Sequence, residues 1–133
     1  MTDDELYVSG LLKQNTYAVR SGVQMGWIRG ENACLTMDVS ENILNLYGMV
    51  HGGAYFTLAD CCAGVVSRMD RRHYVTQHAD VSFFRPIKTG RLIAIGSLIH
   101  RGSKTCTVEV YISDENEKRL FHSTFTFFCI DKD

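Results

Sequence analysis

The chain has 133 residues, of which 45% are hydrophobic and 22% are charged, and its formal net charge is −1. This length suits one domain with a real core, and this composition excludes a disordered or fibrous protein. The charge balance provides no field that would hold nucleic acid, and no cluster of Lys or Arg supplies one. We therefore expect a single globular domain over residues 1–133 that binds no nucleic acid.

The N-terminus, the cysteines and the histidines bear on location and metal binding. Residues 1–5 are acidic and lack the start of a secretion signal, and no uncharged apolar run approaches the roughly 18 residues of a membrane span. The five cysteines follow no disulfide or metal spacing, so we expect reduced thiols in the core. The five histidines form no ligand set such as His-Glu-x-x-His. We expect a cytoplasmic protein with no membrane partner and no metal.

In chain order, residues 1–17 are polar with scattered Leu and Tyr, which predicts a short helix or an arm. A hairpin follows, with strands over Val23–Ile28 and Ala33–Val39 and a four-residue turn over 29–32. Apolar and polar residues alternate in the second strand, as in a half-buried strand. Residues 40–44 predict a turn of helix, and residues 45–50 predict a loop.

The apolar run from Gly52 to Val66 is the longest predicted helix. It is hydrophobic almost all round, which predicts a buried helix, and the Gly-Gly pair at its start leaves the first N–H groups free. A charged break over residues 69–73 ends it. For Arg71 and Arg72 in this break, a solvated helix end and a contact with a phosphate both stay open.

Strand candidates occupy the remaining chain, over Val75–Phe83, Arg91–His100, Thr105–Ser113 and Arg119–Ile130. Arg91–His100 is apolar on both faces and should be a central strand. Turns fall at residues 86–90, 101–104 and 114–118. The order of a hairpin, a buried helix and an antiparallel meander predicts an α+β fold with one sheet around one central helix.

Asp60 lies in the middle of the predicted helix, where an unpartnered buried carboxylate is costly. At about 100° per residue, it lies at the centre of a narrow stripe of small or polar residues. The other members of this stripe are Gly53, Thr57, Gly64 and Ser67. Two explanations stay open from the residues alone. Either Asp60 is catalytic, or it caps something structural while another chain or helix approaches along the stripe.

The order Asn45-x-x-Gly-x-x-His51-Gly52-Gly53, followed by Leu-x-Asp60, resembles the hotdog-fold acyl-CoA thioesterases, specifically their phenylacetic-acid-degradation (PaaI-like) branch. Residues 75–86, which end in an aromatic residue followed by Arg-Pro, are similar to the next strand of that family. The resemblance covers roughly residues 23–130. It implies the hotdog fold, an α+β structure in which an antiparallel sheet wraps around one long central helix.

The resemblance implies hydrolysis of acyl- or aryl-CoA thioesters. The backbone N–H of Gly52 would bind the thioester carbonyl oxygen, assisted by the side-chain amide of Asn45. Asp60 would act as the general base on water or as the nucleophile. Thr76 falls where some relatives carry a Ser that orients the water. His51 would lie near the thiol leaving group or would hold the loop, and both roles stay open.

Four further residues are candidates for binding the substrate. They are Gly53 in the motif, Arg101 and Lys104 in a turn near the pantetheine arm of relatives, and Arg85 before Pro86. The acyl group itself is not readable from the sequence. Tyr47, Tyr55 and Phe56 would line an aromatic pocket or pack in the core, and both straight-chain and aryl substrates stay open.

The resemblance also implies that each site forms between two subunits. We therefore expect a homodimer, or a dimer of dimers (a homotetramer), with an acyl-CoA substrate and no cofactor besides the coenzyme A of that substrate. Two alternatives on the same fold are a non-catalytic acyl-CoA-binding module and a hydratase or dehydratase. The second needs a His/Asp or His/Glu motif that this chain lacks.

Overall fold

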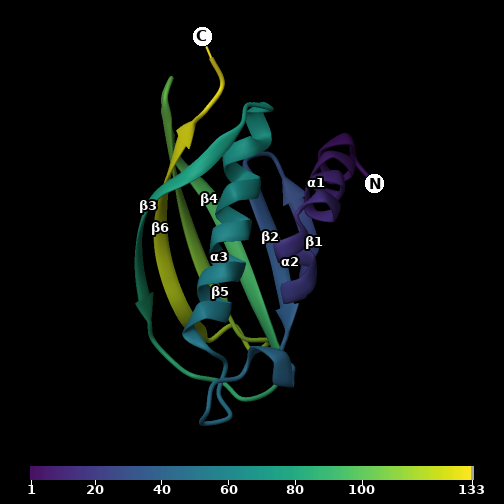
Figure 1. The fold of residues 1–133 in the computed structure, drawn as a ribbon, viewed down its shortest axis with the longest axis vertical. Helices are drawn as coiled ribbons and strands as arrows, with labels where there is room; N and C mark the ends of the chain where they lie inside the picture. Colours follow the sequence, from purple (N-terminus) through teal and green to yellow (C-terminus); the bar gives the residue numbers. More distant parts are fainter. Residues whose placement is uncertain (133) are drawn as a thin grey trace.

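The computed structural model describes residues 1–132, in which six strands form one antiparallel sheet that curves around a single long helix (Figure 1). The elements are α1 (Asp3–Gln14), α2 (Thr16–Ser21), β1 (Val23–Arg29), β2 (Asn32–Asp38), α3 (Gly52–Ser67), β3 (Tyr74–Phe83), β4 (Arg91–Arg101), β5 (Thr105–Ser113) and β6 (Arg119–Cys129). Short 3-10 helices over Glu41–Ile43 and Arg68–Asp70 lie on either side of α3 in the chain. This architecture confirms the predicted hotdog fold.

The central helix α3 is fixed by the side that it turns toward the sheet. Leu58, Cys62 and Val66 on this side are completely buried. In β4, Gly96 allows close approach, because a Cβ atom there would lie 3.1 Å from both Cys62 Sγ and Val66 Cγ2. Each large apolar side chain buried in this way contributes about 1.5–3 kcal/mol. This packing fixes the rotation of α3 about its axis, and so it also fixes the direction in which the polar residues of α3 point.

The strands follow the order β1-β2-β4-β5-β6-β3, so β4 lies inside the sheet as predicted. The prediction of one continuous meander is wrong at β3, which pairs with β6 at the edge instead of with β4. Residues 84–90 prevent a β3–β4 hairpin, because they are hydrogen-bonded to residues at the start of α3. Ile87 O accepts from Val50 N at 2.9 Å, and Arg85 O accepts from the Tyr55 hydroxyl at 3.0 Å. The loop therefore carries the chain across the sheet, and β3 and β4 form no hairpin.

The first hairpin turn is shorter than the predicted four residues. Arg29 pairs with Asn32, so Gly30 and Glu31 alone connect β1 to β2. Gly30 has a φ of +58°, a left-handed conformation that two-residue hairpin turns require and that glycine adopts without strain.

The N-terminal segment, predicted as a short helix or an arm, forms two helices that lie beside α3 (Figure 1). Thr2 and Glu5 form a capping box at the start of α1, and Asn15 caps α2 by accepting from Ala18 N at 3.1 Å. The Tyr17 hydroxyl lies 2.8 Å from Thr57 Oγ1. A helix of this same chain therefore covers part of the small-residue stripe of α3.

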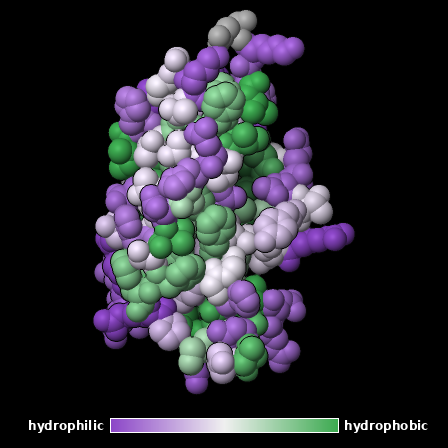
Figure 2. Space-filling model, turned by 60° about the vertical axis from the view of Figure 1, so that its left-hand side comes forward, coloured by the Kyte–Doolittle hydropathy of each residue, from purple (hydrophilic) through white to green (hydrophobic). Residues whose placement is uncertain are grey.

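The outer edge of β3 carries exposed apolar side chains. Val75 and Phe83 are 47% and 52% exposed, and Phe84, directly after the strand, is 53% exposed. Figure 2 turns this side of the molecule forward and shows hydrophobic side chains among polar ones on it. An unpaired edge strand with apolar side chains is a ready surface for pairing with another strand.

Two further features of the structure concern the state of the cysteines and the length of the helices. The five cysteines are free thiols, and four of them are buried. Within residues 1–132, no helix is long and apolar enough to cross a membrane.

Candidate active site

Asp60 lies in the middle of α3 and faces β3. The Thr76 hydroxyl of β3 donates a hydrogen bond of 2.7 Å to Asp60 Oδ1. Burial raises the pKa of Asp60 above its ordinary value, and this hydrogen bond partly lowers it again. The second carboxylate oxygen makes no hydrogen bond within residues 1–132. Asp60 is therefore a positioned carboxylate with one oxygen available and with an increased affinity for a proton, as a general base requires.

The first turn of α3 presents a second group of candidate residues. Within residues 1–132, the backbone N–H of Gly52 has no hydrogen-bond partner. Asn45 Oδ1 accepts from Tyr47 N at 2.9 Å and from Met49 N at 3.1 Å, which fixes the loop before the helix. Its side-chain NH2 group remains as a donor. Asn45, Gly52 and Arg85 line the same cavity of about 290 Å³. Donors at a helix N-terminus favour an oxyanion.

His51 is the N-cap of α3, and its Nδ1 accepts from Gly53 N at 2.8 Å. One of its two predicted roles, holding the loop, is therefore observed. Because Nδ1 accepts, the neutral ring carries its proton on Nε2, which is left for a further contact. The backbone N–H of Gly53 is used in this hydrogen bond to His51, so Gly53 has no N–H left to donate to a substrate.

A single chain does not bring the Asp60–Thr76 pair close to Asn45 and Gly52. Asp60 follows Gly52 by eight residues, a rise of about 12 Å along the helix axis. Asp60 and Thr76 line a groove of about 410 Å³, which is separate from the cavity of Asn45 and Gly52. A thioester carbonyl held by Gly52 is therefore out of reach of Asp60 in the same copy.

The sequence model of the Thioesterase superfamily matches residues 47–121, more than half of the chain. The chain belongs to this superfamily. Its matched region runs from the loop before α3 to β6 and so contains Gly52, Asp60 and Thr76. Membership agrees with the predicted PaaI-like resemblance.

Individual relatives agree with this assignment. The chain is 35% identical over 86 residues to a predicted esterase of Deinococcus radiodurans and 28% identical over 89 residues to the acyl-coenzyme A thioesterase PaaI of Escherichia coli. These matches cover 62% and 66% of this chain but only 58% and 64% of the relatives, less than two thirds of each.

Solved structures share the fold over nearly the whole chain. The structure of E. coli PaaI superposes with a TM-score of 0.89 at 22% identity and covers 96% of this chain and 94% of its own. A hypothetical thioesterase of Streptococcus pneumoniae, solved with coenzyme A, has a TM-score of 0.83 at 26% identity and covers 91% and 98%.

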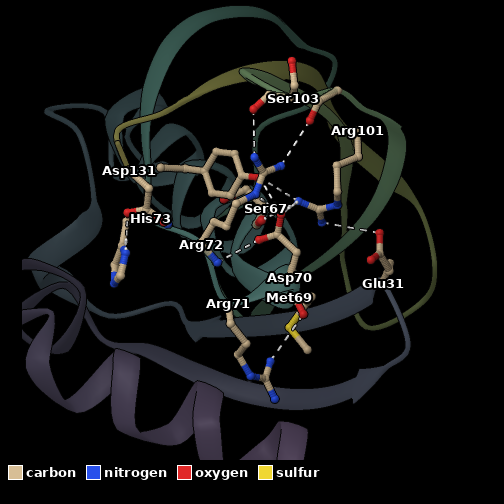
Figure 3. Close-up of polar contacts among 12 residues, drawn as sticks. Glu31, Ser67, Met69, Asp70, Arg71, Arg72, His73, Arg101, Ser103 and Asp131 are labelled. Atoms are coloured by element: carbon tan, nitrogen blue, oxygen red, sulfur yellow. Dashed lines mark hydrogen bonds and ion pairs between the residues drawn. The ribbon is translucent and has the colours of Figure 1, made fainter. Parts of the chain in front are cut away.

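In this thioesterase-superfamily chain, Arg101 does not occupy the exposed turn in which the sequence placed it. It is the last residue of β4, and its side chain is only 17% exposed. Its guanidinium donates to Ser67 O at 2.9 Å and Val66 O at 3.2 Å, and it forms an ion pair of 3.0 Å with Asp70 (Figure 3). These contacts cap the C-terminal end of α3, so the predicted role of Arg101 toward coenzyme A has no support in the geometry.

Asp70 is the anionic centre of this cluster. It also accepts from Arg72 Nε at 2.8 Å and from the Tyr74 hydroxyl at 2.6 Å (Figure 3). Burial would raise the pKa of Asp70, but the hydrogen bonds from Tyr74 and Arg72 and the Arg101 charge lower it to about 2. Arg72 reaches Ser103 O at 2.8 Å, so it is neither a purely solvated helix end nor a free phosphate ligand.

The other cationic candidates differ in position. Lys104 is exposed in the β4–β5 turn, at the end of the molecule where α3 stops (Figure 1). Arg85 is exposed beside Gly52. Within residues 1–132, no group of three or more His, Cys, Asp and Glu is arranged to hold a metal ion.

The aromatic candidates divide between packing and exposure. Tyr55 is buried, with its ring stacked 5.9 Å from that of Phe121. Phe56 is partly exposed against Phe125, and Tyr47 projects from the loop. The groove beside Asp60 involves residues that sequence reasoning missed, namely Leu11 and Leu12 of α1. No local pattern could have found them, because they reach Asp60 only through tertiary packing.

Proposed function

We propose that this protein hydrolyses acyl- or aryl-CoA thioesters to the free acid and coenzyme A. The observation that carries the proposal is Asp60, a carboxylate held by Thr76 at 2.7 Å with a raised pKa in the middle of an otherwise apolar helix. Superfamily membership and the coenzyme A in the structure of the S. pneumoniae relative support the choice of thioester.

The reaction needs attack on the thioester carbonyl carbon and a place for the negative charge that develops on its oxygen. In the proposed mechanism, the Gly52 N–H and the Asn45 amide donate to that oxygen. Ionised Asp60 either takes the proton of the attacking water or attacks the carbonyl itself. The C–S bond then breaks, and the thiolate leaves near the Nε2–H of His51 and takes up a proton. On the general-base route, this is the proton that Asp60 took from the water, and the acid is released directly. On the nucleophilic route, water afterwards hydrolyses the anhydride between the acyl group and Asp60, which releases the acid and restores the carboxylate. Arg85, beside Gly52, is the candidate for a phosphate of coenzyme A.

The proposed enzyme works as a homodimer, with Asp60 and Thr76 from one copy and the Asn45–Gly52 loop from the other. The rise of about 12 Å between Gly52 and Asp60 supports this arrangement, because one copy cannot place both at one carbonyl group. The unpaired and partly apolar edge of β3 supplies a surface on which two copies could pair. A dimer of such dimers remains compatible with these contacts.

The direct test is to measure free coenzyme A released from phenylacetyl-, hydroxybenzoyl- and medium-chain acyl-CoA, with separation of the products. Thiol dyes would react with the protein's own cysteines. The wild type is expected to turn over at least one of these substrates, and Asp60→Ala is expected to lose about 10²-fold or more in kcat. Tight binding without turnover would instead identify an acyl-CoA-binding module. Hydration of an enoyl-CoA without thioester cleavage would identify a hydratase.

A further inference from the structure

Thr76, which holds the Asp60 carboxylate, lies on a strand with little support of its own. β3 is at the edge of the sheet, so β6 is its one neighbouring strand within residues 1–132. The pairing of β3 with β6 is regular over residues 74–76 and shifts register directly after Thr76, at a bulge that contains Gln77. The position of the Thr76 hydroxyl therefore depends on what fixes the start of β3.

Tyr74, the first residue of β3, provides this fixed point. Its side chain is buried, and it faces α3 as Thr76 does, because residues two apart in a strand point to the same side. The Tyr74 hydroxyl donates to Asp70 Oδ2 at 2.6 Å and accepts from Arg101 Nη1 at 3.1 Å. A hydroxyl that both donates and accepts in this way holds its ring in one orientation.

The partners of Tyr74 are themselves attached to the end of α3. Arg101 donates to the carbonyl oxygens of the last two residues of α3, at 3.2 and 2.9 Å, and pairs with Asp70 at 3.0 Å (Figure 3). The strand and the helix are therefore connected twice, by Tyr74 at the helix end and by Thr76 at Asp60. These two connections lie about 10 Å apart along α3. If the first is lost, the start of β3 can move away from the helix and stretch the second.

We propose that Tyr74 is a positioning residue of the catalytic site. Its hydroxyl, bonded to Asp70 and Arg101, holds the start of β3 against α3. This contact keeps Thr76 within hydrogen-bond reach of Asp60. The inference rests on the proposed thioesterase function and adds a residue that acts on the reaction without contact with the substrate.

The acid limb of a pH profile can follow this effect, because the other groups beside Asp60 titrate elsewhere. The groove around Asp60 is lined by three titratable or charged side chains, Cys61, Arg68 and Tyr74, and α1 and β6 add only uncharged residues to it. Burial and the Asp60 charge raise the pKa of Cys61 to about 12. Burial and the hydrogen bond to Asp70 raise the pKa of Tyr74 to about 12, and the pKa of Asp70 itself is lowered to about 2.

The test compares the pH profile of kcat/KM in the wild type, Tyr74→Phe, Thr76→Val and the double variant, with the acyl-CoA that the wild type hydrolyses fastest. Tyr74→Phe is expected to move the acid limb to higher pH by roughly 0.3 units or more and to lower kcat/KM roughly tenfold. In the double variant it should add nothing to the shift of Thr76→Val, because no hydroxyl is left to position. Contributions from His51, which every variant retains, cancel in this comparison.

Tyr74→Phe keeps the ring, and Asp70 keeps its contacts with Arg72 and Arg101, so the variant is expected to fold. Tyr111→Phe is the matched control. It removes the hydroxyl of a Tyr on β5 whose ring packs against His122, and its neighbours along the strand point to the opposite side of the sheet, into the core. The acid limb should not move in this control.

Two results would overturn the positioning role and leave the thioesterase proposal standing. One is an acid limb that does not move in folded Tyr74→Phe, and the other is a shift of the same size with and without the Thr76 hydroxyl. If the wild type turns over no acyl-CoA, the thioesterase proposal fails. NMR titration of the Asp60 carboxyl carbon then decides whether Tyr74 holds Thr76 at Asp60. A higher pKa of Asp60 in Tyr74→Phe than in the wild type is expected, and an unchanged pKa would refute the link.

Discussion

The Asp60 carboxylate lies partly buried on α3, and the Thr76 hydroxyl partly offsets the effect of that burial on its pKa. Either catalytic role of Asp60 requires the ionised form, so kcat/KM should fall on the acid side as Asp60 takes up a proton. Thr76→Val removes the hydrogen bond that lowers the pKa. We expect the acid limb of the pH profile to move to higher pH in Thr76→Val, and to stay near the wild-type position in Thr76→Ser.

A profile that is unchanged in Thr76→Val would show that the Thr76 hydroxyl does not act through Asp60. A lower rate with an unchanged acid limb would point instead to the role in orienting water that the sequence suggested.

Asp60 is also expected to reduce stability near neutral pH. Its pKa in the folded protein is raised above the ordinary value of 3.8. The folded protein therefore holds this proton more tightly than the unfolded chain, and stability falls as pH rises through the interval between the two pKa values. Asp60→Asn should consequently raise the urea midpoint at pH 7 and should lose this advantage well below pH 3.8. A lower midpoint at pH 7 would assign Asp60 a structural role.

At the scale of elements, the C-terminal end of α3 depends on Arg101, which joins two helix carbonyls to Asp70. Arg101→Met should lower the free energy of unfolding by about 2 kcal/mol or more, because the largely buried Asp70 and both carbonyl groups lose a donor. Asp70, with its pKa lowered to about 2, contributes stability above pH 3.8 and loses it as pH falls toward 2. The difference between wild type and variant should therefore shrink in acid.

Urea unfolding at pH 7 and at pH 2.5 measures both effects. Lys88→Met, which changes an exposed cation in the loop before β4, is the control. A higher KM for acyl-CoA at unchanged stability in Arg101→Met would restore the role of Arg101 in binding coenzyme A.

The secondary structure could be read from the sequence because it depends on local periodicity. The strand predicted over Thr105–Ser113 matches β5, and the predicted start at Gly52 matches that of α3. The six-residue helix α2 was missed, because one and a half turns give no periodic pattern. The position of β3 was also missed, since it depends on how residues 84–90 cross the sheet. Strand order is set by such long-range contacts.

The same distinction holds for the candidate site. The motif singled out Asn45, Gly52 and Asp60 as candidates, because it consists of particular residue types at fixed spacing. It could not reveal that Arg101 turns inward or that Leu11 of α1 lies over the groove. Both depend on side chains that meet only in the folded chain.

At the scale of the whole molecule, Gly52 and Asp60 lie about 12 Å apart along α3, and the proposed site takes one of them from each of two copies. We therefore expect a dimer in sedimentation analysis. Introducing a charge on the β3 edge by Val75→Glu should weaken that dimer and reduce kcat together with it. Ile99→Glu, which makes the same kind of change at an exposed apolar position of β4 away from this edge, is the control. A fully active monomer would contradict this arrangement.

The proposed catalytic centre uses Asp60 from one copy and the Asn45–Gly52 loop from another. The most direct test mixes two inactive variants, Asp60→Asn and Asn45→Ala with His51→Ala, under conditions that allow subunits to exchange. Random exchange in a two-fold dimer would give mixed dimers with one intact site each, and so about a quarter of the wild-type activity. Restoration near that level would support the shared site. If the mixture stays as inactive as its components after exchange has been verified, the two halves do not combine across copies, and the shared catalytic centre is ruled out.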